Sequence, residues 1–282
     1  MKKISVIGSG VMGSGVAHLF AQHNYHVTLI DNSDSQLAQA KNSITDKIRY
    51  NKLAKFSNHV DSASEIASRI NFSTNLKEAA NANFIIENIT ENWPKKRDLY
   101  LELNDICSLD SILAVNTSAV PITKIASSVR NPERVIGLHF MNPVVLMPMV
   151  EMIKGYHTSD EVIKKTKNIL NDVKKKYIVV NDFPGFVTNR AMMIFVNEAI
   201  FMVQEKVAAM EDIDTLFRQC FGHKMGPLQT ADLIGLDTIL YSLEVLYEEF
   251  NDSKYRPCWL LKKMVSAGLH GEKSKQGFYS YV

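Results

Sequence analysis

Two sets of residues in this sequence have the types and spacing needed to bind a ligand or move a proton, and the first is a glycine turn. The apolar run 4–7 leads into Gly8-Ser9-Gly10-Val11-Met12-Gly13 and then a helical pattern. A second apolar run ends at Asp31, eighteen residues after Gly13. Glycines so placed let a pyrophosphate approach a helix N-terminus, and the acid binds a ribose. The pattern predicts an NAD site, because Asp31 would repel a 2′-phosphate; an ordinary strand–turn–helix is the alternative.

The second set is a histidine and a glutamate that lie twelve residues apart in apolar surroundings. His139 follows the apolar run 135–138, and Glu151 lies between Val150 and Met152. Histidine has an ordinary pKa of about 6.5, so it can take and return a proton near neutrality. A carboxylate inside an apolar strand needs a partner unless it faces solvent at an edge. We predict that Glu151 orients His139 and stabilises its charged form.

Two further polar residues stand where a ligand could be bound. Ser118 ends Asn116-Thr117-Ser118, which follows a strand-like run, and Asn189 lies in Gly185-Phe186-Val187-Thr188-Asn189-Arg190. Ser118 is a candidate site residue, with a turn or helix cap ahead of Pro121 as the alternative. Asn189 is also a candidate, although an asparagine on an opening helical turn often bonds its own backbone.

The elements that position these residues are predicted to form an α/β fold. Strand-like and helix-like segments alternate over the first two-thirds of the chain, which indicates a doubly wound, mostly parallel, Rossmann-type sheet. Strands are expected at 4–7, 27–30, 70–73, 84–87, 112–115, 135–138, 149–152 and 177–180. The polar amphipathic stretch 34–68 lacks a strand and predicts a helical insertion of two helices. His139 is expected at the carboxyl edge of the sheet, where such folds bind ligands.

The pattern changes at Asp182-Phe183-Pro184-Gly185, a strong break. Beyond it, helices are expected at 186–207, 211–221, 228–250 and 257–267. We therefore predict an NAD-binding domain over 1–183 and an all-helical substrate and dimerisation domain over 184–282. The apolar faces of the helical part favour a homodimer through that domain, with a plain helical core as the alternative.

Composition excludes several classes of protein. The 282 residues carry a formal net charge of +2, which is too small to indicate nucleic-acid binding, and 46% of them are hydrophobic. Three widely spaced cysteines indicate neither a disulfide framework nor a metal site. No apolar stretch reaches membrane-spanning length, and the first strand begins too early for a signal peptide. A cytoplasmic protein is expected.

The chain resembles the L-3-hydroxyacyl-CoA dehydrogenase family, including bacterial 3-hydroxybutyryl-CoA dehydrogenases, over essentially its whole length. The matching motifs are VIGSGVMGSGVA, IENITEN, VNTSAVPIT, GLHFMNPV, VEMI, DFPGFVTNR, MGPLQTADLIGLD and QGFYSY. The resemblance implies a reversible reaction in which a 3-hydroxyacyl thioester and NAD give a 3-oxoacyl thioester and NADH. It also implies a nucleotide domain followed by a helical dimerisation domain.

The resemblance implies roles for individual residues as well. His139 would be the catalytic base and Glu151 its partner, while Ser118 and Asn189 would bond substrate or cofactor. The NAD contacts implied are Gly8, Gly10, Val11, Met12, Gly13, Asp31, Glu91, Lys96, Ser118 and Asn142. The helical insertion would bind part of CoA, with Lys47, Lys52 and Lys55 as candidates.

Departures from the family pattern keep the substrate open. Met147-Pro148-Met149 lacks a lysine that is common there, and Ser274-Lys275 replaces a Thr-Gly pair. These changes leave the alternative of a small, glyceryl-like acyl group on an acyl carrier protein, as in polyketide extender-unit pathways. A dehydrogenase of free hydroxy acids and a non-catalytic NAD-binding protein are further alternatives, and the four catalytic candidates argue against the second.

Overall fold

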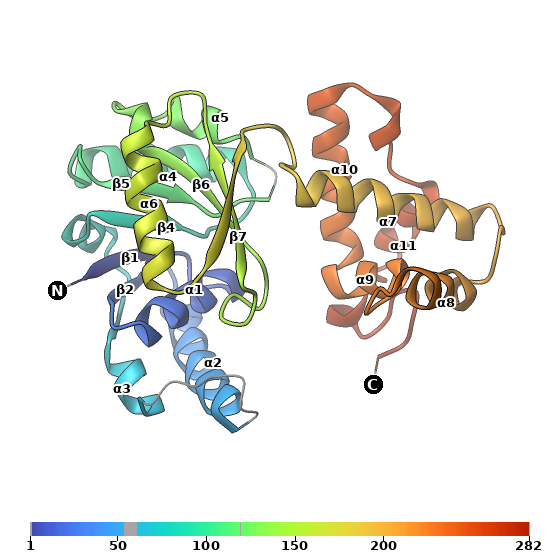
Figure 1. Cartoon of the computed structure of the whole chain (residues 1–282), viewed down its shortest axis with the longest axis horizontal. Helices are drawn as coiled ribbons and strands as arrows, with labels where there is room; N and C mark the ends of the chain where they lie inside the picture. The colour runs from blue at the N-terminus through green and yellow to red at the C-terminus, as the bar shows by residue number, and fades with distance from the viewer. Residues whose placement is uncertain (1, 54–60, 119, 282) are drawn as a thin grey trace. The chain divides into compact units, whose positions relative to one another are not determined.

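The chain folds into two compact units, which a computed structural model describes over residues 2–53, 61–118 and 120–281. Unit 1 is Met1–Asp182 and unit 2 is Phe183–Val282 (Figure 1). The division lies one residue before the boundary predicted from the sequence. Among the described residues, every helix is too short or too polar to cross a bilayer.

Unit 1 is built on one eight-stranded sheet. The strands are β1 (Lys3–Ile7), β2 (His26–Ile30), β3 (Ile70–Ser73), β4 (Phe84–Glu87), β5 (Ile112–Val115), β6 (Val135–Phe140), β7 (Met149–Lys154) and β8 (Lys176–Asn181). Their order across the sheet is β3-β2-β1-β4-β5-β6-β7-β8. All neighbouring strands are parallel except β6 and β7, which pair antiparallel. The mostly parallel, doubly wound sheet predicted from the sequence is confirmed.

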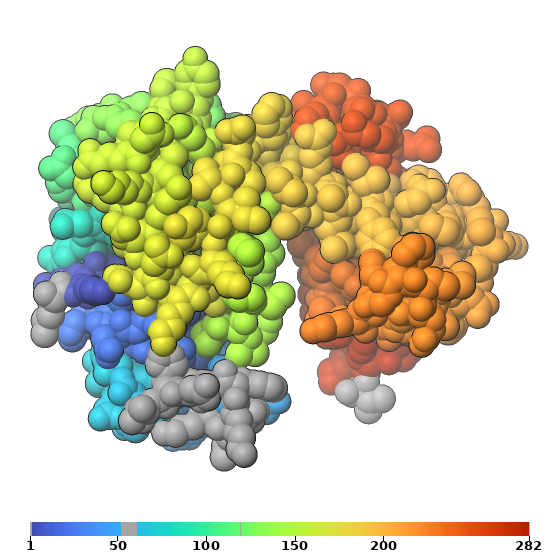
Figure 2. Space-filling view, viewed as in Figure 1, coloured from blue at the N-terminus to red at the C-terminus, as the bar shows by residue number. Residues whose placement is uncertain are grey.

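Helices cover both faces of this sheet. They are α1 (Val11–Gln22), α2 (Asp34–Leu53), α3 (Ala63–Ser68), α4 (Trp93–Ile106), α5 (Ile122–Ala126) and α6 (Asp160–Asp172), with 3-10 turns η1 (Leu76–Asn81) and η2 (Pro132–Arg134). Apolar residues of α1, α2, α3 and α6 form one buried cluster with alternate residues of the strands, such as Ile4 and Val6. In Figures 1 and 2, α6 covers the face of the sheet nearest the viewer. Burial on both faces explains why the central strands are almost continuously apolar.

The predicted helical insertion is present as α2 and α3, which follow β2. A capping box starts α3, because Ser62 accepts from the Glu65 N–H while the Glu65 carboxylate accepts from the Ser62 N–H. The insertion adds helix to the nucleotide fold without adding a strand.

Unit 2 is all helical. Its helices are α7 (Thr188–Gln204), α8 (Met210–Phe221), α9 (Pro227–Ile234), α10 (Leu236–Phe250) and α11 (Trp259–Ser266), with 3-10 turns η3 (Ser253–Tyr255) and η4 (Glu272–Ser274). The single helix expected over 228–250 is wrong. Gly235 has φ +100° and separates α9 from α10. That backbone conformation suits glycine and cannot continue an α-helix.

Candidate active site

The glycine turn forms part of a cleft at the carboxyl edge of the sheet. It joins β1 to α1, and Gly8 adopts φ +92°, a conformation that favours glycine. A Cβ on Gly13 would collide with the Gly8 carbonyl oxygen, whereas one on Gly10 would meet no described atom within 4 Å. The space beside Gly10 therefore stays open, while Val11 and Met12 begin α1.

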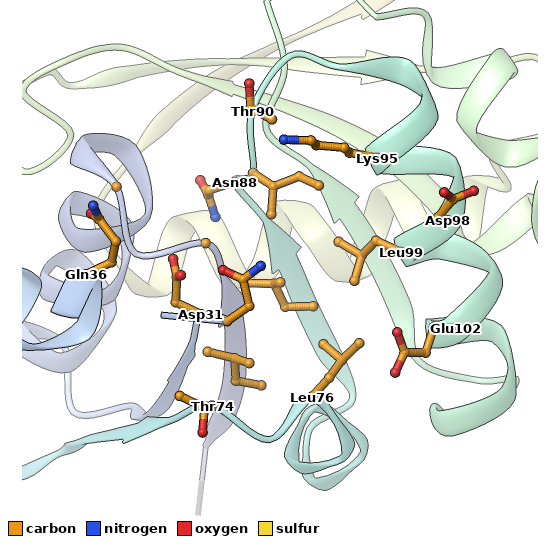
Figure 3. Close-up of a pocket in the computed structure, with 16 residues that line it drawn as sticks. Asp31, Gln36, Thr74, Leu76, Asn88, Thr90, Lys95, Asp98, Leu99 and Glu102 are labelled. Carbon is orange, nitrogen blue, oxygen red and sulfur yellow. The ribbon is translucent and has the colours of Figure 1, made fainter. Parts of the chain in front are cut away.

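This cleft has a volume of about 740 Å³, and Asp31 is one of the residues that line it (Figure 3). The Asp31 carboxylate accepts hydrogen bonds from the Ser9 N–H and the Ser9 hydroxyl, both at 2.8 Å. Its other oxygen accepts from the Ser33 N–H at 3.1 Å. Asp31 thus braces the glycine turn from the end of β2. The open glycine turn, the helix N-terminus and this acid together fit a dinucleotide.

One face of α4 forms the opposite wall of the cleft. Lys95, Asp98, Leu99 and Glu102 line the space, at helical spacings of three and four residues. Figure 3 shows Leu99 and Glu102 on the same side as Leu76 of η1, with Lys95 near Thr90 at the other end. These residues were not predicted from the sequence, although their spacing after β4 was a signal for them.

Lys96, predicted to contact NAD, is absent from the lining of this cleft. Its side chain is fully buried, and its ammonium donates to both oxygens of Glu87 at 2.8 Å. The Ile89 N–H and the Tyr100 hydroxyl also donate to Glu87. Burial raises the pKa of Glu87, and the ammonium opposes that effect. Lys96 therefore pairs with the last residue of β4, whereas its neighbour Lys95 lines the cleft.

His139 and Glu151 meet because β6 and β7 are antiparallel neighbours. The two residues are directly opposite in the register, and Nδ1 of His139 lies 2.8 Å from a carboxylate oxygen of Glu151. Only 7% of His139 and 5% of Glu151 is exposed. An ionised carboxylate can only accept a hydrogen bond, so Nδ1 carries the proton and, in neutral imidazole, Nε2 keeps its lone pair.

Ser118 contacts the other nitrogen of the same ring. Its hydroxyl oxygen lies 3.0 Å from Nε2 of His139. Glu91 fixes this serine, because its carboxylate accepts from the Ser118 N–H and from the Thr117 hydroxyl, each at 2.7 Å. The structure therefore brings Glu91, Ser118, His139 and Glu151 into one continuous hydrogen-bonded chain.

Asn116 connects this chain to the carboxyl end of β4. Its side-chain amide donates to the Asn88 side-chain oxygen at 2.7 Å, and its own oxygen accepts from the Phe140 N–H. Asn88 also lines the dinucleotide cleft. The cleft and the histidine therefore share one edge of the sheet, through a contact that sequence reasoning missed.

The remaining predicted residues lie elsewhere. Asn142 is exposed, two residues beyond β6, and Asn189 lies in the first turn of α7 in unit 2. Lys47 is exposed on α2, which also contains Lys52. Lys55 lies outside the described residues. The roles of these residues stay predictions.

A Rossmann-type cleft that shares a sheet edge with a histidine–carboxylate pair is typical of NAD-dependent oxidoreductases. Family models give the finer assignment. The NAD binding domain of 3-hydroxyacyl-CoA dehydrogenase matches residues 3–183, and the C-terminal domain of the same enzyme matches residues 185–281. The chain belongs to the 3-hydroxyacyl-CoA dehydrogenase family, and its cofactor is NAD.

Three similar proteins match over nearly their full length. A probable 3-hydroxybutyryl-CoA dehydrogenase of Deinococcus radiodurans is 44% identical, with 99% of this chain and 100% of that protein covered. A protein of the same description from Bacillus subtilis is 43% identical, with 100% and 98% covered. The crystal structure of (S)-3-hydroxybutyryl-CoA dehydrogenase PaaH1 from Ralstonia eutropha is 35% identical, with a TM-score of 0.94 and 100% and 99% covered.

Proposed function

We propose that this enzyme interconverts a 3-hydroxyacyl-CoA and the corresponding 3-oxoacyl-CoA, with His139 as the group that takes and returns the hydroxyl proton. One observation carries the proposal: a buried imidazole is bonded at Nδ1 to a carboxylate and at Nε2 to a hydroxyl, at the edge of the sheet that forms the NAD cleft. The names of the similar proteins support a short acyl chain such as 3-hydroxybutyryl.

The tautomer of His139 supports its role as a base. With Nδ1–H held by Glu151, the Nε2 lone pair can accept the proton of an alcohol. The imidazole then becomes a cation, and the adjacent carboxylate stabilises that charge. When bound, NAD supplies the acceptor for the hydride that leaves the same carbon.

Ser118 supports the orientation of the substrate. Its hydroxyl lies beside Nε2, where the reacting oxygen would be, and Glu91 holds its backbone in place. We assign Ser118 to a hydrogen bond with this oxygen and Asn189 to a second one. Asn142 is assigned to the nicotinamide side, and the exposed Lys47 to the CoA phosphates, with Lys52 of the same helix as a second candidate.

A His139→Gln variant tests the chemical assignment. We expect turnover of acetoacetyl-CoA and NADH to fall about 100- to 10,000-fold, which is what general acid–base catalysis contributes. Binding of NADH, measured by its fluorescence, should stay unchanged because the glycine turn and Asp31 are intact. Near-normal turnover would show that another group moves the proton.

A comparison of three substrates tests whether the acyl group is carried by CoA. Acetoacetyl-CoA, free acetoacetate and a small 3-oxoacyl group on an acyl carrier protein are each offered with NADH, and the loss of absorbance is followed. Turnover of the CoA thioester alone supports the proposal. Turnover of the carrier-bound group alone would overturn the assignment to CoA, and turnover of the free acid would overturn the need for a thioester.

We also propose a homodimer formed through unit 2. Large apolar side chains are exposed there, including Phe221 and Trp259, each 70% exposed. Large exposed apolar side chains favour a protein interface where they form a contiguous patch. Analytical ultracentrifugation tests the assembly, and a monomer at micromolar concentration would contradict it.

A further inference from the structure

A buried lysine outside the catalytic set contacts the segment that joins the two catalytic strands. We call residues 141–148 the β6–β7 loop, because they run from the strand of His139 to the strand of Glu151. Lys175 is only 5% exposed, and its ammonium donates to the carbonyl oxygens of Val145 at 3.0 Å and Met147 at 2.6 Å. Two loop carbonyls are therefore held by one side chain.

The β6–β7 loop also packs on the helix that begins at the glycine turn. Val144 is 3% exposed, and a Cβ added to Gly15 of α1 would lie 2.9 Å from its side chain. The loop is thus fixed at Val144 by α1 and at its next residues by Lys175. A shift of the loop would move the end of β6 or the start of β7 relative to α1.

The backbone around Lys175 directs its side chain inward. Lys174 has φ +57°, and the N–H groups of Lys174 and Lys175 donate to the carbonyls of Asn171 and Leu170. These two bonds are the Schellman motif that ends α6. The next residue, Lys176, donates its N–H to the Pro148 carbonyl and starts β8 beside β7. Lys175 is therefore held where α6, β8 and the loop meet.

Burying an ammonium at this position costs folding free energy, so packing alone does not explain why a lysine is found there. Burial without a neighbouring carboxylate among its bonded partners lowers the pKa of Lys175 to about 8. An apolar side chain would fill the same space without that cost, but it would leave the two carbonyls without this donor.

We infer that Lys175 is a positioning residue of the active site, whose ammonium fixes the β6–β7 loop and through it the placement of His139 against Glu151. It touches neither the catalytic pair nor the cleft, and it acts through the loop backbone. The inference rests on the proposed function of His139, and it adds a residue that the catalytic motifs leave out.

Three variants separate positioning from general stability. Lys175→Met keeps the length of the side chain but removes its donors, Lys175→Arg keeps a charged donor, and Lys176→Met removes an exposed charge one residue away. With acetoacetyl-CoA we expect Lys175→Met to lower kcat about 10- to 100-fold, the effect of a small misplacement of catalytic groups. The KM for NADH should stay within about twofold of the wild-type value, because the variant keeps the contacts that bind the cofactor. Lys175→Arg should recover most of kcat, and Lys176→Met should match the wild type.

Proton NMR supplies a readout that does not depend on turnover. The Nδ1 proton shared by His139 and Glu151 should give a resonance far downfield, which Lys175→Met shifts or broadens and Lys176→Met leaves in place. An unchanged resonance together with unchanged kcat in Lys175→Met would overturn the inference. If Lys175→Met fails to fold, Lys175→Gln takes its place, with the same expected result and the same contrary result. If the wild type does not reduce acetoacetyl-CoA, the proposed function fails, while the resonance still decides the role of Lys175.

Discussion

At the scale of single residues, the site works because each polar group has a partner that fixes its orientation. Glu151 holds one nitrogen of His139, Ser118 lies at the other, and Glu91 fixes Ser118. Buried polar groups of this kind are costly when their hydrogen bonds are lost, so removing one member takes a hydrogen bond from its neighbour. The partner of the histidine therefore matters as much as the histidine itself.

Replacing Glu151 by Gln should lower turnover about 100-fold or more. The amide keeps the size of the side chain but removes the negative charge that stabilises an imidazolium, and it can donate to the ring and favour the wrong tautomer. Steady-state kcat with acetoacetyl-CoA and NADH measures the effect.

Glu161→Gln is the matched control, because Glu161 pairs with Lys165 on the exposed surface of α6. It should retain full turnover. A Glu151→Gln enzyme as active as this control would remove Glu151 from the mechanism.

At the scale of elements, the register of two strands and the ends of helices decide the site. His139 faces Glu151 only because β6 and β7 pair in one particular register. A slip of one residue would turn Glu151 to the opposite face of the sheet. The β6–β7 loop and the end of α6 lie next to this pair of strands, so the geometry of that helix end bears on the site.

Lys174→Gly should stabilise unit 1. Lys174 has φ +57° in the Schellman motif, where a residue with a side chain costs about 1–2 kcal/mol. Glycine removes that strain but loses about 0.5–1 kcal/mol through its greater freedom in the unfolded chain. The net gain should be about 0.5–1 kcal/mol in the free energy of unfolding, measured by urea denaturation.

Lys176→Gly is the comparison, because Lys176 is the first residue of β8 and glycine weakens strands. It should lose stability while Lys174→Gly gains it. Equal losses in both variants would contradict the assignment of strain to Lys174.

At the scale of the whole molecule, protonation is linked to unfolding. Burial lowers the pKa of Lys175 to about 8 in the folded protein, below its ordinary value of 10.5. Between these values the unfolded chain holds the proton and the folded chain releases it, so unfolding takes up a proton. The destabilising effect of the buried charge is complete below about pH 8 and is relieved as pH rises toward 10.5.

Comparison of the wild type with Lys175→Met isolates this linkage from other groups. As pH rises above 8, the unfolding free energy of the wild type should increase relative to that of Lys175→Met, by at most about 1.4 kcal/mol per pH unit. The two tryptophans, Trp93 in unit 1 and Trp259 in unit 2, allow unit 1 to be followed alone in a Trp259→Phe background. Parallel stability curves for the two proteins would refute the linkage.

The sequence by itself determined the features that depend on short-range spacing. The glycine turn, Asp31 at the end of β2, the eight strands and the break before unit 2 all follow from patterns within a few residues or one βα unit. Such patterns can be interpreted without knowing the tertiary structure, because they arise from local backbone geometry and from the spacing of buried apolar residues along a helix or strand. They sufficed to indicate an NAD-binding fold and to place His139 at its edge.

Beyond the predicted pair of His139 and Glu151, only the tertiary structure decided which side chains meet. Lys95 and Lys96 are indistinguishable by type, yet the rotation of α4 turns one to the cleft and buries the other against Glu87. The contact of Lys175 with Val145 and Met147 spans about 30 residues of chain. Local sequence patterns do not predict these long-range contacts, because strand order, register and helix rotation are fixed only when the whole core packs.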